Sequence, residues 1–385
     1  MAKNKKIKDF SLANIKVVGI GGAGGHIITR MAEKEGIRNV EFIAINTDAQ
    51  DLEYAKAHKK IFIGKTLTCG LGAGMNPELG RRAAEENHSE ISETLQGADI
   101  IFITAGLGGG TGSLASGVVA DISREMGALT IAVVTKPFSF EGAQRMRIAQ
   151  EALAQIKTKV DTLVVIPNDR IFNIINKDTS LIKAFEFVDD VLKNAVQAIT
   201  ELIVSPGIIN LDFADIKAVM KDAGSAVIGI GMTTGAERAI NAVNVAVNSP
   251  LLENSIDGAK GVLFSVSGGR DLKMSEIQTI AKIISDTVDP GAKVIFGAYF
   301  DRRLPAKNIK VTLIATGFSY GNIPQIIKPV SLFNPAYQEE SADSSVFSNK
   351  KEQLAPIEER NKIEEKTEIP SFLRRKNTAK GKSRI

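Results

Sequence analysis

Apolar runs and amphipathic stretches alternate through the first half of the chain. Five short runs rich in valine and isoleucine lie at residues 15–20, 40–46, 100–104, 129–135 and 162–166. They are apolar at consecutive positions, which is typical of parallel strands covered on both faces. Strands of this kind, separated by helices, predict a doubly wound α/β fold with a parallel sheet.

The pattern changes at residues 180–205, where apolar residues recur at steps of three and four. One helix of about 25 residues is predicted there, long enough to connect two domains, and Pro206-Gly207 ends it. A second, smaller α/β domain is predicted by apolar runs at 226–230, 262–266, 294–300 and 311–316, and by amphipathic stretches near 236–247 and 275–287. Residues 336–368 then have the polar composition of a disordered linker.

The composition excludes several classes of protein. Of 385 residues, 44% are hydrophobic, enough for a sizeable core, whereas 5% are aromatic and none is tryptophan, which argues against a surface that stacks nucleic-acid bases. A single cysteine, Cys69, and three scattered histidines exclude a disulfide framework and a cluster of metal ligands. Because no apolar run reaches the roughly 18 residues of a membrane span and we find no signal peptide, we expect a cytoplasmic protein.

Positive charge gathers at the two ends of the chain. The net charge is +4, of which the first ten residues contribute +3 and residues 374–385 contribute +6, so the rest carries −5. An acidic body with basic ends is unlike a DNA-binding domain with a basic face. The ends are either solvated tails or segments that meet an acidic partner or anionic lipid.

Three glycine-rich segments carry the candidate chemistry. Residues 19–25 (GIGGAGG) and 106–113 (GLGGGTGS) each follow a predicted strand, and residues 70–76 (GLGAGMN) precede a helix predicted to begin at Asn76-Pro77-Glu78. Glycines let backbone amides approach a phosphate, and a helix N-terminus adds positive potential. A phosphate-bearing ligand is therefore expected, with tight turns that bind nothing as the alternative.

The first segment fits two kinds of ligand. It contains G-x-G-x-x-G, which suits a dinucleotide with Asp48 as the acid that binds the ribose. A dinucleotide does not need a second glycine cradle after a later strand, whereas two cradles that face one crevice suit a triphosphate. The G-x-x-x-x-G-K-[ST] motif is absent, so the chain is not a P-loop enzyme.

Seven motifs, in order along the chain, resemble the FtsZ family of the tubulin/FtsZ superfamily. They are GGAGG (21–25), INTDAQ (45–50), GLGAGMNP (70–77), GLGGGTGS (106–113), KPFSFEG (136–142), PNDR (167–170) and NLDFADIKAVM (210–220). The resemblance covers about residues 12–320, and IPSFLRR (369–375) is similar to the short C-terminal peptide of the family.

The resemblance implies a GTPase that binds GTP, releases GDP and works with Mg²⁺ held mainly by phosphates and water, with no metal ligand assigned to the protein. The nucleotide would contact Gly21, Gly22, Ala23, Gly24, Gly25, Gly72, Ala73, Gly74, Gly108, Gly109, Gly110, Thr111 and Gly112.

The resemblance also implies roles for individual side chains around the nucleotide. Glu141 and Arg145 would contact ribose and phosphate, although an i,i+4 surface ion pair is the simpler interpretation. Asn168 and Asp190 would bind guanine through its N–H groups, which adenine lacks. Phe185 would stack on the base, with core packing as the alternative.

Three polar residues are the implied catalytic group: Asn210, Asp212 and Asp215. The spacing of the two acids places them at the start of a helix predicted at 213–220, where Asp212 as the N-cap is the simpler interpretation. The resemblance implies instead that the acids enter the nucleotide site of the next subunit and act on water. Hydrolysis would then require head-to-tail assembly into a filament.

The resemblance also implies an organisation, a location and partners. The domains would be an N-terminal extension (1–11), a GTP-binding domain (12–179), a connecting helix (180–205), a second α/β domain (206–320), a linker (321–368) and a C-terminal peptide with a basic end (369–385). The filaments would form the bacterial division ring in the cytoplasm, beneath the membrane at mid-cell. Membrane-anchor and division-regulating proteins would bind Ile369, Pro370, Phe372, Leu373 and Arg374.

Two other functions remain open, and the chain departs from the family pattern in places. A nicotinamide-dependent oxidoreductase would rest on G-x-G-x-x-G alone, and a non-hydrolysing scaffold is opposed by the two acids. Ser113-Leu114 stands where the family often has Thr-Gly, and His26, to which we assign no role, where Asn is common. Glu186 and Asp189 add negative charge beside the predicted base site.

Overall fold

The computed structural model describes residues 13–33, 40–173, 175, 178–204, 208–209, 212–249, 255–301, 304–305 and 307–318. The predicted N-terminal extension, the linker from residue 321 and the C-terminal peptide lie outside the described residues, and so does Asn210.

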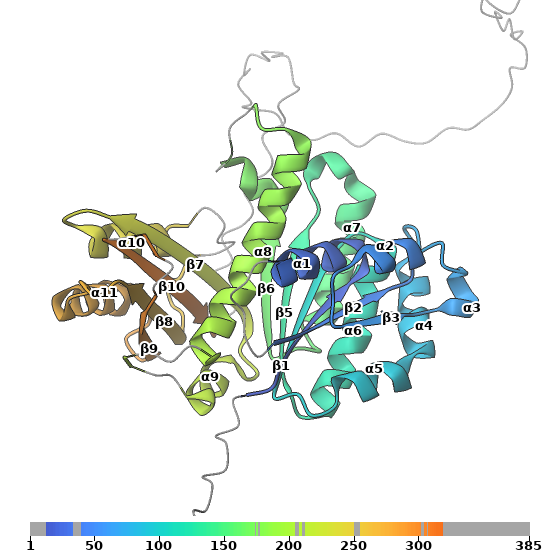
Figure 1. Cartoon of the computed structure of the whole chain (residues 1–385), viewed down its shortest axis with the longest axis horizontal. Coiled ribbons are helices and arrows are strands. Elements are labelled where there is room, and N and C mark those ends of the chain that lie inside the picture. Colours follow the sequence, from blue (N-terminus) through green and yellow to red (C-terminus); the bar gives the residue numbers. More distant parts are fainter. Residues whose placement is uncertain are drawn as a thin grey trace, which may run out of the picture. The chain divides into compact units, whose positions relative to one another are not determined.

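A ten-stranded sheet forms the framework of the described residues (Figure 1). Its first part has the order β3-β2-β1-β4-β5-β6, and all these strands are parallel. This order is that of a doubly wound sheet, as predicted. The strands are β1 (Ile15–Ile20), β2 (Val40–Asn46), β3 (Lys59–Phe62), β4 (Ile100–Gly106), β5 (Leu129–Lys136) and β6 (Thr162–Pro167).

The second part continues the same sheet as β7-β10-β8-β9. β7 pairs with β6 in parallel along three residue pairs, from Thr162↔Gly224 to Val164↔Ala226. β10 is antiparallel to both of its neighbours, so this part of the sheet is mixed rather than parallel. The strands are β7 (Gly224–Thr234), β8 (Gly261–Gly268), β9 (Lys293–Phe300) and β10 (Asn308–Thr316).

Helices cover both faces of the sheet because its strands are apolar on both sides. In β1, Ile15 and Val17 pack against one face, and Val18 and Ile20 against the other. The first face carries α1 (Gly21–Glu33), α8 (Leu181–Val204) and α9 (Phe213–Met220). The second face carries α4 (Pro77–Glu86), α5 (His88–Leu95), α6 (Gly110–Glu125) and α7 (Ala143–Ile156).

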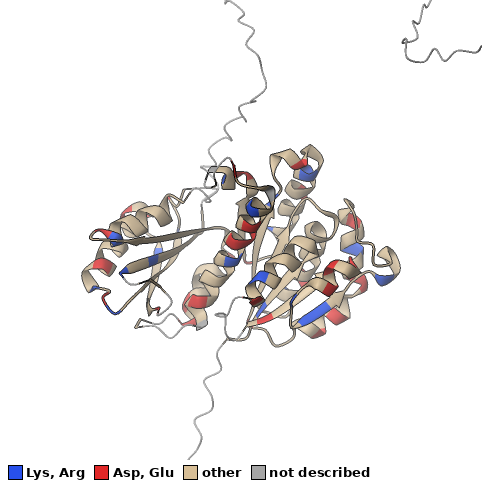
Figure 2. Ribbon diagram, turned by 45° about the horizontal axis from the view of Figure 1, so that its top comes forward, with Lys and Arg blue, Asp and Glu red and all other residues tan. Residues whose placement is uncertain are grey.

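The remaining elements are short or belong to the second part. The helices α2 (Ala49–Tyr54) and α3 (Lys65–Thr68) lie near β2 and β3, and two 3-10 helices, η1 (Ser139–Glu141) and η2 (Asn168–Asn173), follow β5 and β6. The helices α10 (Arg238–Val247) and α11 (Met274–Thr287) pack on the mixed strands. Acidic and basic residues are interspersed over the helices in Figure 2, so the described part presents no purely basic face in that view.

The helix α8 connects the two parts of the sheet, as its sequence pattern predicts. It begins after β6 and η2, at the edge where the parallel strands end, and its 24 residues span about 36 Å. Its buried residues, among them Leu192, Ile199 and Leu202, share a core with strands of both parts. Near its C-terminus the Tyr299 hydroxyl on β9 donates to the Leu202 carbonyl at 3.0 Å.

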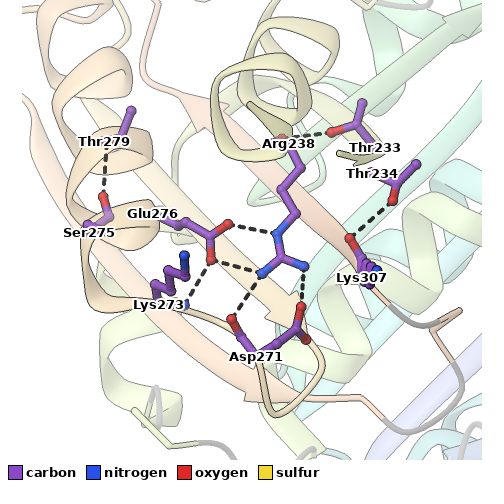
Figure 3. A network of polar contacts seen from close by, with 9 residues as sticks. All are labelled: Thr233, Thr234, Arg238, Asp271, Lys273, Ser275, Glu276, Thr279 and Lys307. Carbon is purple, nitrogen blue, oxygen red and sulfur yellow. Dashed lines mark hydrogen bonds and ion pairs between the residues drawn. The ribbon is translucent and has the colours of Figure 1, made fainter. Parts of the chain in front are cut away.

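A buried arginine holds the second part together (Figure 3). The Arg238 guanidinium at the start of α10 is 6% exposed and donates to both Glu276 carboxylate oxygens, at 2.7 and 3.0 Å, and to Asp271 Oδ2 at 2.6 Å. Bonds from Arg238 lower the pKa of both carboxyls. Since burial of a charge is costly without partners, this network fixes α10 against the start of α11.

Candidate functional site

Two of the glycine segments meet where the order of strands reverses. β1 and β4 are neighbours in the sheet, but α1 lies on one face and α6 on the other. In sheets of this kind such a divergence opens a crevice at the carboxyl ends of the two strands, which is the usual ligand position. Both α1 and α6 begin within these segments, at Gly21 and Gly110, so their N-termini face the crevice.

The three glycine segments touch one another through their backbones. A Cβ atom on Gly21, which has a φ of +72°, would lie 3.1 Å from the Gly112 nitrogen. On Gly110 it would overlap the Gly74 carbonyl oxygen and lie 2.9 Å from the Ala73 Cβ atom. The floor of the crevice is therefore closed by backbone that tolerates no side chain.

The open side of the same segments has different neighbours. A Cβ atom on Gly109 or Gly74 would meet nothing within 4 Å. Gly24, by contrast, packs on the sheet, because its Cβ atom would lie 2.7 Å from the Thr104 carbonyl oxygen. Gly109 and Gly74 thus border open space, where the phosphates are predicted, whereas Gly24 serves the close approach of helix and strands.

Buried hydroxyl groups join the segments, one of them on Thr47, to which the sequence motifs assigned no role. Thr47 Oγ1 and Thr111 Oγ1 are 2.6 Å apart. The Thr47 carbonyl accepts bonds from Thr68 Oγ1 at 3.1 Å and from the Gly72 amide at 3.2 Å. The position of Thr47 directly after a predicted strand is the signal that would have found it. Asp48 caps α2, because its Oδ1 atom accepts from two backbone amides.

Glu141 and Arg145 follow the carboxyl end of β5. Arg145 donates to Glu141 Oε2 at 2.7 Å, so the i,i+4 ion pair is present. Glu141 Oε1 accepts from the Phe138 amide at 2.9 Å, which fixes the carboxylate beside the crevice. Contacts of this pair with ribose and phosphate stay a prediction.

Asn168 follows the carboxyl end of β6 and is 6% exposed. Its Oδ1 atom and Thr104 Oγ1 are the buried side-chain atoms of the described residues that have no hydrogen-bond partner. A buried acceptor without a donor costs about 1–3 kcal/mol. A ligand with an N–H group, such as a guanine base, would satisfy it.

Phe185 lies near the start of α8 among other aromatic rings. Its ring is perpendicular to that of the buried Phe138, with 5.4 Å between centroids, yet Phe185 is 41% exposed. Phe140 and Phe172 also contact Phe138 and are exposed. Core packing and an exposed ring surface thus occur together at this position.

Asp190 lies on α8 about one and a half turns after Phe185. Its Oδ1 atom accepts from Lys193 Nζ at 2.6 Å, and the Lys193 side chain is only 6% exposed. The lysine holds one carboxylate oxygen in place while the side chain of Asp190 stays 39% exposed. The predicted role of Asp190 in guanine binding stays a prediction.

Asp212 and Asp215 lie far from the glycine segments of the same chain. Asp212 is exposed and caps α9, with its Oδ1 atom 2.6 Å from the Asp215 amide nitrogen, as its N-cap interpretation predicts. The helix α9 leads into β7, which starts beside the first residue of β6. Figure 1 shows α9 at the edge where the parallel strands begin, and the two acids are the N-cap and a first-turn residue of this helix.

Both sides of the segment that carries these acids are fixed. Before it, the Ile208 and Ile209 amides donate to the Ala298 carbonyl on β9, at 2.7 and 3.2 Å. After it, the Val219 carbonyl at the end of α9 accepts from Thr316 Oγ1 at 3.1 Å.

Among the described residues, no group of three or more His, Cys, Asp or Glu could hold a metal ion. None of the described helices has the length and apolar character of a membrane span.

The fold and the crevice define a nucleotide-binding protein, and comparisons with known proteins specify it. Residues 14–176 match the family model described as Tubulin/FtsZ family, GTPase domain, and residues 224–319 match FtsZ family, C-terminal domain. The structure of an empty FtsZ dimer from M. jannaschii is 50% identical, with a TM-score of 0.76, over 80% of this chain and 89% of that chain. CetZ1 from Haloferax volcanii, a GDP-bound monomer, shares the fold at 21% identity, with a TM-score of 0.68, over 80% of this chain and 95% of that chain.

The chain therefore carries a GTPase domain of the tubulin/FtsZ type. It belongs to the FtsZ family. GTP binding and the predicted enzyme class are confirmed, and the oxidoreductase interpretation is wrong.

Proposed function

We propose that this chain polymerises head to tail into protofilaments, and that each interface completes a GTPase site with Asp212 and Asp215 of the neighbouring subunit. The observation that carries the proposal is the position of α9, which begins with these acids, at the edge of the sheet where the parallel strands begin. A nucleotide bound to the same subunit would lie at the carboxyl ends of these strands, the other edge of the sheet. Head-to-tail repetition brings the two edges together, and the relative from M. jannaschii is described as a dimer.

In this proposal different residues of the crevice bind the phosphates, the base and the ribose of GTP. The amides of Gly21, Gly72, Gly74, Gly109 and their neighbours hold the phosphates, and the N-termini of α1 and α6 add positive potential. Asn168 and Asp190 read the guanine edge while Phe185 packs on its face. Glu141 and Arg145 contact the ribose and phosphates, and their mutual ion pair is partly replaced by these contacts.

Catalysis in the proposal is a matter of positioned water. GTP bound with Mg²⁺ supplies the terminal phosphate and the charge that offsets the acids. Asp212 and Asp215 orient a water molecule from the neighbouring side, with Asn210 as a further polar contact. The bonds of Ile208 and Ile209 to β9, and of the end of α9 to β10, fix both sides of the segment that carries these acids, which supports a hydrolysing protein rather than a scaffold.

The substitution Asp212→Asn tests the division of the site between subunits. Asparagine also caps helices, so α9 should persist, GTP binding should remain near wild type, and most turnover should be lost. Mixing this variant with Gly109→Ser, which is chosen to impair GTP binding, should restore part of the turnover. Phosphate release and nucleotide binding are measured in parallel, and loss of GTP binding by isolated Asp212→Asn subunits would contradict the assignment.

The division-ring role, the location beneath the membrane and the predicted domains belong to the same proposal. The tail at 369–385 is proposed to bind anchor and regulatory proteins through Ile369, Pro370, Phe372, Leu373 and Arg374, with many tails per filament raising avidity. Truncation at Glu368 should leave GTP turnover intact and abolish co-sedimentation with an anchor protein on vesicles. Normal co-sedimentation of the truncated protein would rule the docking role out.

A further inference from the structure

Arg30 joins two helices that approach the candidate nucleotide from different sides. It lies on the third turn of α1, and its Nη2 atom is 3.1 Å from Glu186 Oε1 on α8. Its Nε atom is 3.3 Å from Asp189 Oδ2, and Nη1 donates to the Glu186 backbone carbonyl at 3.5 Å. One guanidinium thus contacts two carboxylates and one carbonyl of the same helix.

These contacts are made by residues that lie between the two proposed base contacts, on the same side of α8. Glu186 follows Phe185 in the chain, and Asp189 precedes Asp190. At its other end, α1 begins with Gly21, which lies on the floor of the crevice. Arg30 therefore joins the helix that presents the phosphate-binding glycines to the helix that presents the base-binding side chains.

Apolar packing alone does not fix how the two helices are offset. Ile27 and Ile28 of α1 share a core with Val188 and Leu192 of α8, and contacts between aliphatic side chains have little directional preference. A planar guanidinium with several fixed N–H directions is directional. The fork of Arg30 is thus suited to hold one offset of α1 relative to α8.

The acids around Arg30 make this contact sensitive to charge. Asp189 is 17% exposed, and its burial raises its pKa to about 6, with Asp190 and Glu186 acting in the same direction. Arg30 and the exposed His26 on α1 act in the opposite direction. Asp190 itself is paired with Lys193.

We propose that Arg30 is a positioning residue of the nucleotide site, whose contacts with Glu186 and Asp189 set the distance between the phosphate-binding end of α1 and the base-binding face of α8. The proposal rests on the proposed function, because it takes Phe185 and Asp190 as base contacts. Arg30 itself touches neither base nor phosphate in this scheme. It acts by holding the two binding elements at the spacing of one guanine nucleotide.

The test compares binding of GTP and ITP, which lacks the 2-amino group of guanine, to full-length variants. Arg30→Gln should weaken GTP binding about three- to tenfold and reduce the preference for GTP over ITP, because the base contacts are displaced. Arg30→Lys should rescue this preference only in part, since lysine keeps the charge without the fork. The control is Lys56→Gln, which removes the exposed ion pair with Glu33 at the end of α1 but no contact with α8.

The possible results separate the two proposals. An unchanged preference in Arg30→Gln overturns the positioning role, as does an equal loss of GTP and ITP binding with a lower melting temperature, which is the signature of a merely structural contact. If Asp190→Asn leaves the preference unchanged in an otherwise wild-type chain, the base site itself is misassigned. A reduced preference for GTP over ITP in both Arg30→Gln and Asp190→Asn, together with a wild-type preference in Lys56→Gln, supports both the base site and the positioning role of Arg30.

Discussion

Two adjacent glycines in the candidate phosphate loop have opposite surroundings, and alanine at each should act in a different way. Neither has a positive φ, so the backbone accepts alanine at both positions. At Gly110 the new Cβ atom would overlap the Gly74 carbonyl and press on Ala73. At Gly109 it would project into open space, where we place the phosphates.

The magnitudes follow from what each Cβ atom meets. At Gly110 the obstacle is backbone, which yields only if two glycine segments separate, so Gly110→Ala should cost about 1–3 kcal/mol of stability, as overpacking does. At Gly109 nothing is displaced without ligand, so the melting temperature should not change. With GTP, the methyl group stands between amide and phosphate, and loss of one charged hydrogen bond of about 1.5–3 kcal/mol weakens binding tenfold or more.

Differential scanning calorimetry of the nucleotide-free variants and titration with GTP measure these two effects separately. We expect Gly110→Ala to melt several degrees below wild type, and Gly109→Ala to melt with wild type but bind GTP poorly. Equal melting temperatures for the two variants would refute the packing argument. Wild-type GTP affinity in Gly109→Ala would show that the phosphates do not lie on this loop.

Three further predictions concern single side chains. Asp190→Asn presents a donor to the N–H groups of guanine and should weaken GTP binding at least about tenfold; calorimetric titration with equal affinity would move the base site elsewhere. Arg238→Met leaves two carboxylates without their cation and should lower unfolding stability by about 2 kcal/mol, whereas Arg81→Met, which removes only exposed ion pairs, should have a much smaller effect in the same urea titration. The pKa of Asp189 is raised from 3.8 to about 6, so the stability contributed by its protonated form is present below pH 4 and is lost as pH rises through 6. Asp189→Asn should therefore be more stable than wild type by about 1–3 kcal/mol at pH 8 and equal to it at pH 4. A stability difference that does not depend on pH would contradict the burial of this carboxylate.

The sequence predicts the strands well because strands buried on both faces consist of consecutive apolar residues. All nine predicted strands are present, in some cases longer by a few residues. The omitted strand, β3, has four residues and begins with the exposed Lys59 and Lys60. It lies at the edge of the sheet, where lysines are common and the apolar signal is weak. The N-cap of α4 at Asn76 and the length of α8 were also predictable, since both depend on local chemistry.

The arrangement of the site was less accessible to sequence reasoning. Motifs identify the glycine segments, but only the strand order brings Gly21 so close to Gly112 that a Cβ atom on Gly21 would lie 3.1 Å from the Gly112 nitrogen. The ion pair of Glu141 and Arg145 is local and was foreseen as an alternative. Arg30 and Glu186 are separated by 156 residues, and no periodicity connects them. Such pairs follow from the packing of α1 on α8, which a single sequence does not encode in readable form.

The joint between β6 and β7 has a mechanical consequence. Three residue pairs connect these strands, from Thr162↔Gly224 to Val164↔Ala226, whereas β7 and β10 pair along nine residues. We therefore expect twisting of the sheet to occur mainly at this short ladder, because fewer backbone pairs resist it there than elsewhere in the sheet. The helix α8 shares a core with Val164 of β6 and Ala226 of β7, so we expect a change at the start of α8, where the base is proposed to bind, to affect this joint. The amides of Gly224 and its neighbours should then exchange hydrogen faster than those of β5, and nucleotide should alter their exchange more than that of any strand far from the joint.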